Sequence, residues 1–218
     1  MKQLFIRILK NTSLYYPLYN WKAKREQVKE LIEWERKGRP VPPPHIVKQR
    51  TLQVYSTRFG LKILIETGTY CGDMIEAMKD SFDRLYSIEL SKELYEKTKE
   101  RFEGVKHIEL IHGDSGLELR NVIKKINQPA LFWLDGHYSA GDTAHGDKET
   151  PIYEEMSHIL NASDRGDVII IDDARCFGAD PSYPSIGELS DFIRSKRTNI
   201  DIVVQDDSIR ITPKNSRL

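Results

Sequence analysis

The sequence predicts an α/β protein in which helices cover both faces of a mostly parallel sheet. From Leu61 onward, short apolar runs rich in Ile, Leu and Val alternate with amphipathic stretches of helical period. The apolar runs are nearly continuous, which is typical of strands buried on both faces. The chain of 218 residues is 39% apolar and 30% charged, as expected for a globular protein with one sizeable core.

An amphipathic helix is predicted near the N-terminus, over residues 21–37. Val28, Leu31 and Ile32 lie on one stripe of this helix, with Trp34 beside them. The glycine and prolines that follow must stop the helix, and they form a stiff, extended connector. The sequence therefore places a helical arm before the α/β alternation begins.

A second helix is expected over residues 46–59, so that the chain divides into an arm, residues 1–45, and a sheet domain, residues 46–218. The N-terminal region is basic, since residues 1–62 hold 14 Lys and Arg against 4 Asp and Glu, whereas the remainder holds 19 against 29. The basic region can pack against the acidic body. Alternatively it meets an anionic partner, such as a lipid surface, a nucleotide-linked substrate or another subunit.

Strands and helices are then expected in strict alternation. The predicted strands are residues 62–68, 84–90, 107–114, 130–136 and 167–173, followed by a pair within 201–213 that is joined at Asp206 and Asp207. The predicted helices are residues 72–79, 91–102, a segment that ends at 125, 151–160 and 185–196. This alternation favours a parallel sheet with both faces covered, to which the terminal hairpin adds one antiparallel strand.

Several classes of protein are not indicated. Cys71 and Cys176 lie far apart and in no metal-ligand spacing, so neither a zinc site nor a disulfide framework is expected, and a cytoplasmic location is the natural inference. The N-terminal stretch is a poor signal peptide, and no segment approaches a membrane span. No nucleic-acid partner is expected, because the acidic body is unlike a surface that tracks phosphates.

Acidic residues stand at the ends of the first three strands, where parallel sheets bind nucleotide-type ligands. Glu66 precedes the glycines of Gly68-x-x-x-Gly72, which do not fit a dinucleotide fingerprint. A carboxylate there would repel phosphate and attract an ammonium or sulfonium cation. Glu89 is placed to accept ribose hydroxyls, and Asp114 is placed to meet an adenine edge.

A second acidic cluster is predicted where the fourth and fifth strands end. Asp135 and His137 follow the fourth strand, and Asp172 and Asp173 end the fifth. These strands are expected to be neighbours, so that three carboxylates and one imidazole converge. Hard oxygen ligands with room for water suit Mg²⁺ or a similar divalent ion. The alternative for the acidic pair is a hydrogen-bonded cap of the turn.

Together these motifs resemble those of the class I S-adenosylmethionine-dependent methyltransferases. The matching segments are ETGTYCG, YSIEL, HGDS, WLDGH and IIIDD, in the family's order. The resemblance implies a Rossmann-like sheet of seven strands with the last antiparallel, and S-adenosylmethionine as cofactor. The methionine moiety would contact the first glycine loop, the ribose Glu89, and the adenine the third strand's end. The sequence departs from the family at Thr67 and at Thr69–Cys71, where many members carry more glycine or alanine. The implied cofactor-binding residues are Glu66, Gly68, Thr69, Tyr70, Gly72, Glu89, Leu90, Asp114, Ser115 and Asp135.

The second cluster is similar to that of the metal-dependent O-methyltransferases, especially those acting on sugars and other natural-product hydroxyls. This resemblance implies that Asp135, Asp172 and Asp173 hold the metal and that His137 is the base, with Tyr138 or His145 as alternatives; the catalytic residues are then His137 and Asp135. The loop at residues 138–150 is interpreted as a substrate lid. Arg175 either meets an anionic group of the substrate or forms a surface ion pair.

The sequence therefore predicts an O-methyltransferase, assisted by a divalent ion, for a hydroxyl of a sugar or a related natural-product or glycan acceptor. Two alternatives stay open: a metal-independent small-molecule methyltransferase, and a non-catalytic binding module that retains the fold. Methylation of nucleic-acid bases is not favoured, because the fourth strand lacks an Asn-Pro-Pro-aromatic or Pro-Cys motif. The basic arm is a candidate surface for a homo-oligomer or for contact with a lipid-linked substrate.

Overall fold

The computed structural model of the protein describes residues 15–135 and 150–214. The chain divides into two compact units, Met1–Lys48 and Gln49–Leu218. Within the described ranges, no helix is long and apolar enough to cross a membrane. Both cysteines are free thiols.

The first unit is built on one long helix, α2 (Tyr15–Arg36). Of the predicted apolar stripe, Leu31 and Trp34 are buried, whereas Val28 and Ile32 are 45% and 58% exposed. Trp34 Nε1 donates a 2.7 Å hydrogen bond to the Pro40 carbonyl, and the buried pair packs against the apolar residues that begin the next helix. This partner is short, so it covers one edge of the stripe, and the buried face is narrower than the sequence predicted.

The second unit carries the α/β alternation, and every strand and helix predicted from residue 46 onward is confirmed to within a few residues. The sequence did not predict the short 3₁₀ turn η1. In chain order the elements are α3 (His45–Phe59), β1 (Ile63–Thr67), α4 (Asp73–Met78), β2 (Arg84–Glu89), α5 (Lys92–Arg101), β3 (Ile108–His112), α6 (Ser115–Ile123), β4 (Ala130–Leu134), α7 (Ile152–Asn161), β5 (Val168–Ile171), η1 (Ala174–Cys176), α8 (Ile186–Lys196), β6 (Ile200–Gln205) and β7 (Ser208–Pro213).

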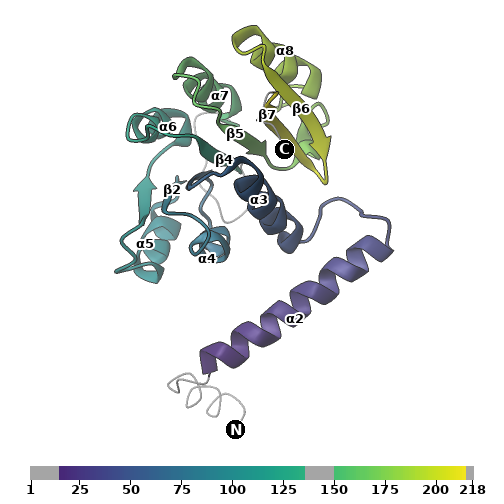
Figure 1. Ribbon diagram of the computed structural model, residues 1–218, viewed down its shortest axis with the longest axis vertical. Coiled ribbons are helices and arrows are strands. Elements are labelled where there is room, and N and C mark those ends of the chain that lie inside the picture. The colour runs from purple at the N-terminus through teal and green to yellow at the C-terminus, as the bar shows by residue number, and fades with distance from the viewer. Residues whose placement is uncertain (1–14, 136–149, 215–218) are drawn as a thin grey trace. The chain divides into compact units, whose positions relative to one another are not determined.

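The seven strands form one sheet in the order β3-β2-β1-β4-β5-β7-β6 (Figure 1). The first five strands pair in parallel, and β7 runs antiparallel to both of its neighbours. Helices α6, α7 and α8 cover one face of the sheet, while α3, α4 and α5 cover the other (Figure 1). The predicted Rossmann-like sheet with an antiparallel last strand is confirmed.

Burial on both faces explains the nearly continuous apolar runs. All residues of β1, β4 and β5 are buried. Within β1, Ile65 packs in the core under α6, α7 and α8, and Leu64 packs in the core under α3 and α4. Because successive strand residues point to opposite faces, the last two residues of β1, Glu66 and Thr67, do so as well. Glu66 and Thr67 therefore lie on opposite faces of the sheet at the end of the same strand.

Deletion of residues 1–40 is expected to leave the second unit folded, because the deletion removes none of its strands or helices. Far-ultraviolet circular dichroism should lose only the signal of α2, and thermal unfolding should stay cooperative. The full-length chain is the control. Loss of the cooperative transition in the shortened chain would show that the sheet needs the arm in order to fold.

Candidate functional site

The carboxyl ends of the parallel strands meet along one edge of the sheet. The backbone N–H of Asp135 donates to the carbonyl of Thr67 at 3.1 Å, and the N–H of Asp172 donates to the carbonyl of Leu134 at 3.0 Å. These bonds extend the strand ladder by one residue and fix the first residue of each loop. The acids that were predicted from the strand ends therefore share one edge.

Glu66 is buried at this edge and takes part in a short chain of hydrogen bonds. The Ser87 hydroxyl donates to Glu66 Oε2 at 2.5 Å, and the Thr69 hydroxyl lies 2.6 Å from the Ser87 oxygen. Burial raises the pKa of Glu66 to about 8; the Ser87 bond opposes this shift, and the charges of Asp135 and Glu89 add to it. The Glu66 carboxyl is thus mostly protonated at neutral pH unless a cation lies beside it.

Glu89, at the end of β2, holds the loop that follows β1. Its Oε2 accepts a hydrogen bond from Tyr70 N and its Oε1 accepts one from Ser91 N, both at 2.8 Å. Tyr70 has a left-handed backbone with φ 49°, a conformation that costs a non-glycine residue free energy. Each carboxylate oxygen has a second lone pair, which remains available to a ribose hydroxyl. Leu90 is half-buried beside it.

The glycine loop also depends on close packing against α5. Gly72 has φ 77°, and a Cβ atom at this position would lie 2.7 Å from the Phe102 ring and 2.8 Å from the Thr98 methyl group. The Thr98 hydroxyl in turn donates to the carbonyl of Tyr70 at 3.1 Å. Gly68 is left-handed too, with φ 82°. The loop is therefore fixed by its own backbone and by α5 before any ligand binds.

The two residues predicted near the adenine play different structural parts. Asp114 is the N-cap of α6 and accepts a 2.8 Å hydrogen bond from Gly116 N. Ser115 is buried, and its hydroxyl acts on the carboxyl group of Glu155 in α7. Asp114 thus lies in the loop between β3 and α6, whereas the Ser115 side chain lies in the interface between α6 and α7.

Asp135, Asp172 and Asp173 are brought together at the corner between β4 and β5. One carboxylate oxygen from each lies within 4.8 Å of the other two. Asp172 and Asp173 are each only 4% exposed. Three hard oxygen atoms this close fit a divalent ion such as Mg²⁺, which binds oxygen at about 2.1 Å. Their role as ligands stays a prediction.

Asp173 also forms an ion pair, which bears on its use as a ligand. Arg175 Nη1 lies 2.6 Å from Asp173 Oδ1, and the same guanidinium contacts the Asp207 carboxylate in the β6–β7 turn. The backbone N–H of Arg175 also donates to Asp207 Oδ1, at 2.9 Å. Of the two expectations for Arg175, the ion pair is the one that the structure shows. Asp173 therefore belongs both to this ion pair and to the three-carboxylate corner.

The predicted base, His137, lies outside the described residues. The same holds for its alternatives, Tyr138 and His145, and for all but the last residue of the loop at residues 138–150. The roles given to them from the sequence stay predictions.

Two buried polar residues near this edge were missed by the sequence analysis. Ser87 of β2 pairs with Glu66 of β1 in the register of the two strands. Glu155 is 2% exposed on the inner face of α7, where its neighbours in the apolar repeat are Ile152, Met156 and Ile159. The available signal was a carboxylate at the i+3 position of an i, i+4, i+7 apolar repeat.

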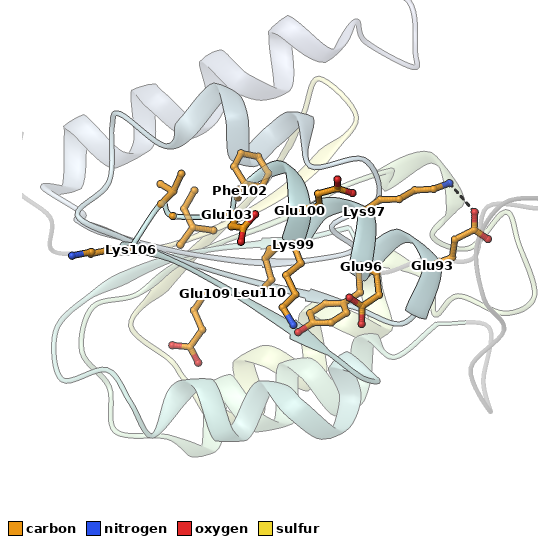
Figure 2. Close-up of a pocket in the computed structure, with 14 residues that line it drawn as sticks. Glu93, Glu96, Lys97, Lys99, Glu100, Phe102, Glu103, Lys106, Glu109 and Leu110 are labelled. Atoms are coloured by element: carbon orange, nitrogen blue, oxygen red, sulfur yellow. Dashed lines mark hydrogen bonds and ion pairs between the residues drawn. The ribbon is translucent and has the colours of Figure 1, made fainter.

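A groove of about 900 Å³ lies elsewhere, along α5 and the edge strand β3 (Figure 2). It is lined by a mixture of Lys and Glu side chains with a few apolar ones, and by none of the predicted site residues. One of its ion pairs, Lys97 with Glu93, is exposed to solvent. The groove therefore does not mark the candidate site, which is defined by the strand-end acids.

The sheet order and the antiparallel last strand match a Rossmann-like methyltransferase fold, and solved S-adenosylmethionine-dependent methyltransferases are similar to the chain in overall structure. An O-methyltransferase from Bacillus cereus in complex with SAH has a TM-score of 0.57 at 16% identity, over 86% of this chain and 90% of that one. The O-methyltransferase TomG from Streptomyces achromogenes, involved in tomaymycin synthesis and solved with SAM, has a TM-score of 0.56 at 17% identity, over 86% and 88%. SAH-bound PaMTH1 from Podospora anserina has a TM-score of 0.53 at 16% identity, over 94% and 97%. No protein-family model and no curated protein matches the sequence. At these identities the likeness establishes the fold.

Proposed function

We propose that this protein is an S-adenosylmethionine-dependent O-methyltransferase that acts on a hydroxyl of a sugar or a related natural-product or glycan acceptor. The observation that carries the proposal is the corner formed by Asp135, Asp172 and Asp173, which lies on the same sheet edge as the buried acids Glu66 and Glu89. One group of acids suits a cationic donor, and the other suits a divalent ion that activates a hydroxyl. The O-methyltransferases with the same fold support the O-methylation part of this proposal.

The donor is proposed to bind over the loop between β1 and α4. Glu66 would offer a negative charge to the ammonium or sulfonium group, and Glu89 would offer its remaining lone pairs to the ribose. Asp114 would stand at the adenine end. Because burial keeps Glu66 protonated near neutral pH, a bound cation is expected to lower its pKa and to release its proton.

Methyl transfer at this edge needs an aligned and deprotonated acceptor. The acceptor oxygen would form a bond to the methyl carbon, while the carbon–sulfur bond breaks and leaves its electron pair on sulfur. His137 would take the hydroxyl proton near neutral pH. A divalent ion held by the three carboxylates would supply Lewis acidity that lowers the pKa of the hydroxyl. Asp135 acts electrostatically on Glu66 and belongs to the cluster, so it would link donor and acceptor.

The ion pair between Arg175 and Asp173 favours one alternative, a metal-independent methyltransferase. A carboxylate that is shared with a guanidinium is a weaker metal ligand, and Arg175 carries a permanent positive charge at the same corner. In that case Asp135 and His137 would orient and deprotonate the acceptor without an ion. The response of turnover to a chelator separates the two mechanisms.

The basic N-terminal region is proposed to recruit an anionic partner. Residues 1–62 carry 14 basic against 4 acidic side chains, which would attract a lipid-linked or nucleotide-linked acceptor or the acidic body of a second copy. Removal of residues 1–40 is then expected to impair acceptor use or oligomerisation more than donor binding.

S-adenosylmethionine is expected to bind this protein, whereas NAD is not, because the spacing Gly68-x-x-x-Gly72 does not fit a dinucleotide fingerprint. Titration calorimetry with both ligands measures this, and turnover with a sugar acceptor separates an enzyme from a binding module. In buffers of different ionisation enthalpy, the wild type should release a proton on binding that Glu66→Gln does not. Tight binding of NAD without any response to S-adenosylmethionine would overturn the proposal.

A further inference from the structure

The interface between β1, α6 and α7 holds a buried carboxyl group that the proposed chemistry does not use. Glu155 is 2% exposed and Thr67, at the end of β1, is fully buried. Glu155 Oε1 and Thr67 Oγ1 have no hydrogen bond of good geometry among the described residues. Buried polar atoms without partners are rare, and each calls for an explanation.

The Glu155 carboxyl lies between two hydroxyls from different elements. The hydroxyl of Ser115, the first residue of α6, lies close enough to the Glu155 carboxyl to lower its pKa. The hydroxyl of Thr67 does the same from the end of β1. A carboxyl group has two oxygens, so a single side chain on α7 can interact with both elements at once. Strand β1 leads into the glycine loop, and helix α6 follows Asp114, the residue that is predicted to meet the adenine.

Other contacts keep α7 close to the start of α6. His158 Nε2 lies 2.7 Å from the carbonyl oxygen of Gly116. A Cβ atom at Gly116 would lie 3.3 Å from the Glu154 Cβ and 3.4 Å from the Pro151 Cβ. Since no larger residue fits there without a shift, the first turns of α6 and α7 meet at a fixed distance. A change at Glu155 is therefore transmitted to the start of α6.

We propose that Glu155 is a positioning residue that joins the end of β1 to the start of α6 and so sets the spacing between the methionine and adenine ends of the cofactor site. This inference rests on the proposed function, because the site that it positions is the proposed donor site. Glu155 does not touch the reacting atoms. It acts through Thr67 and Ser115.

The charge of Glu155 makes this positioning depend on pH. Burial raises its pKa from an ordinary value of 4.5 to about 7; the two hydroxyls oppose the shift, and the carboxylates of Asp114 and Glu154 add to it. These charged neighbours are both negative, so ionisation of Glu155 brings a third negative charge into the interface. Because this pKa is raised above its ordinary value, the stability that protonated Glu155 contributes is fully present below about pH 4.5 and is lost as the pH rises to about 7.

The test uses the full chain and two readouts. Without cofactor, the backbone amides of Gly68 and Gly116 should titrate together near pH 7 in nuclear magnetic resonance spectra, and Glu155→Gln should abolish this shared step while the fold is kept. With cofactor, the affinity of the wild type for S-adenosylmethionine, taken relative to that of Glu155→Gln at each pH, should fall above about pH 7, because Glu66 contributes the same pH dependence to both proteins. Glu155→Leu should bind about tenfold more weakly, because the carboxyl group that lies between the Ser115 and Thr67 hydroxyls is gone. Glu154→Gln, one residue away, is the matched control: it should keep the shared step and the fall in affinity, both moved to a slightly lower pH, because it removes one of the charges that raise the Glu155 pKa.

Two outcomes would overturn the proposal. In the first, either amide fails to titrate with Glu155, which would show that the carboxyl does not join the two elements. In the second, Glu155→Leu is folded and binds S-adenosylmethionine as tightly as the wild type. Failure of the proposed function looks different, because the wild type would then not bind S-adenosylmethionine at any pH while the two amides still titrate together.

Discussion

Replacement of Asp172 by Ala is expected to abolish metal-stimulated turnover and to leave the protein folded. Asp172 supplies one of three carboxylate oxygens that lie within 4.8 Å of one another, and it follows β5, so it faces the strand edge. Removal of one ligand from three leaves a site that cannot hold a hard divalent ion against water. With several kcal/mol of charge stabilisation lost, turnover should fall by about 10²-fold or more. Asp135→Ala should behave in the same way.

The measurement has two arms. Calorimetry with Mn²⁺ on the protein alone reports ion binding without activity, and turnover in a chelator followed by added Mg²⁺ reports its use. Asp191→Ala, an exposed acid on α8, is the matched control and should change neither. His137→Ala should spare ion binding and lower the rate by about 10²–10⁴-fold, the usual loss for a positioned base. Wild-type rates in excess chelator, together with an active Asp172→Ala variant, would favour the metal-independent mechanism.

Gly72→Ala is expected to destabilise the protein far more than Gly104→Ala. Both glycines have nearly the same left-handed backbone, φ 77° and φ 79°, but a Cβ meets Phe102 and Thr98 only at Gly72, and at Gly104 it meets nothing within 4 Å. The backbone alone should cost about 1–2 kcal/mol at either position. Overpacking should add about 1–3 kcal/mol at Gly72 only.

The free energy of unfolding from urea titrations measures both variants. Their difference isolates the packing of the glycine loop on α5. The Gly72 variant should also bind the donor more weakly, because relief of the clash moves the loop, whereas the Gly104 variant should bind normally. Equal destabilisation by the two substitutions would show that the loop yields without cost.

The fold was predictable because the information for it is local. Five apolar runs, each followed by a helical pattern, define the parallel strands, and a hairpin pattern around Asp206 and Asp207 defines the antiparallel end. The arm was less predictable. Its apolar stripe was identified, but whether Val28 and Ile32 are covered depends on a tertiary partner that periodicity does not reveal.

The candidate site was predictable in part for the same reason. An acid at a strand end is visible in the sequence, and the parallel order then brings Asp135 and Asp172 to one corner. Contacts that depend on two distant segments were not visible. Ser87 supports Glu66 only because of the register between β1 and β2, and Asp207 reaches Arg175 only because β7 returns beside β5.

The β6–β7 turn has a practical consequence for modifying this protein. Hairpin turns near the end of a chain are the usual positions for inserting an epitope tag. Here Asp207 is only 6% exposed, and it holds Arg175, which also pairs with Asp173. An insertion at this turn would free Asp173 from its cation, so the hairpin would lose stability while the three-carboxylate corner would gain affinity for a divalent ion. A tag placed there would therefore alter the ion dependence that it was meant to help measure.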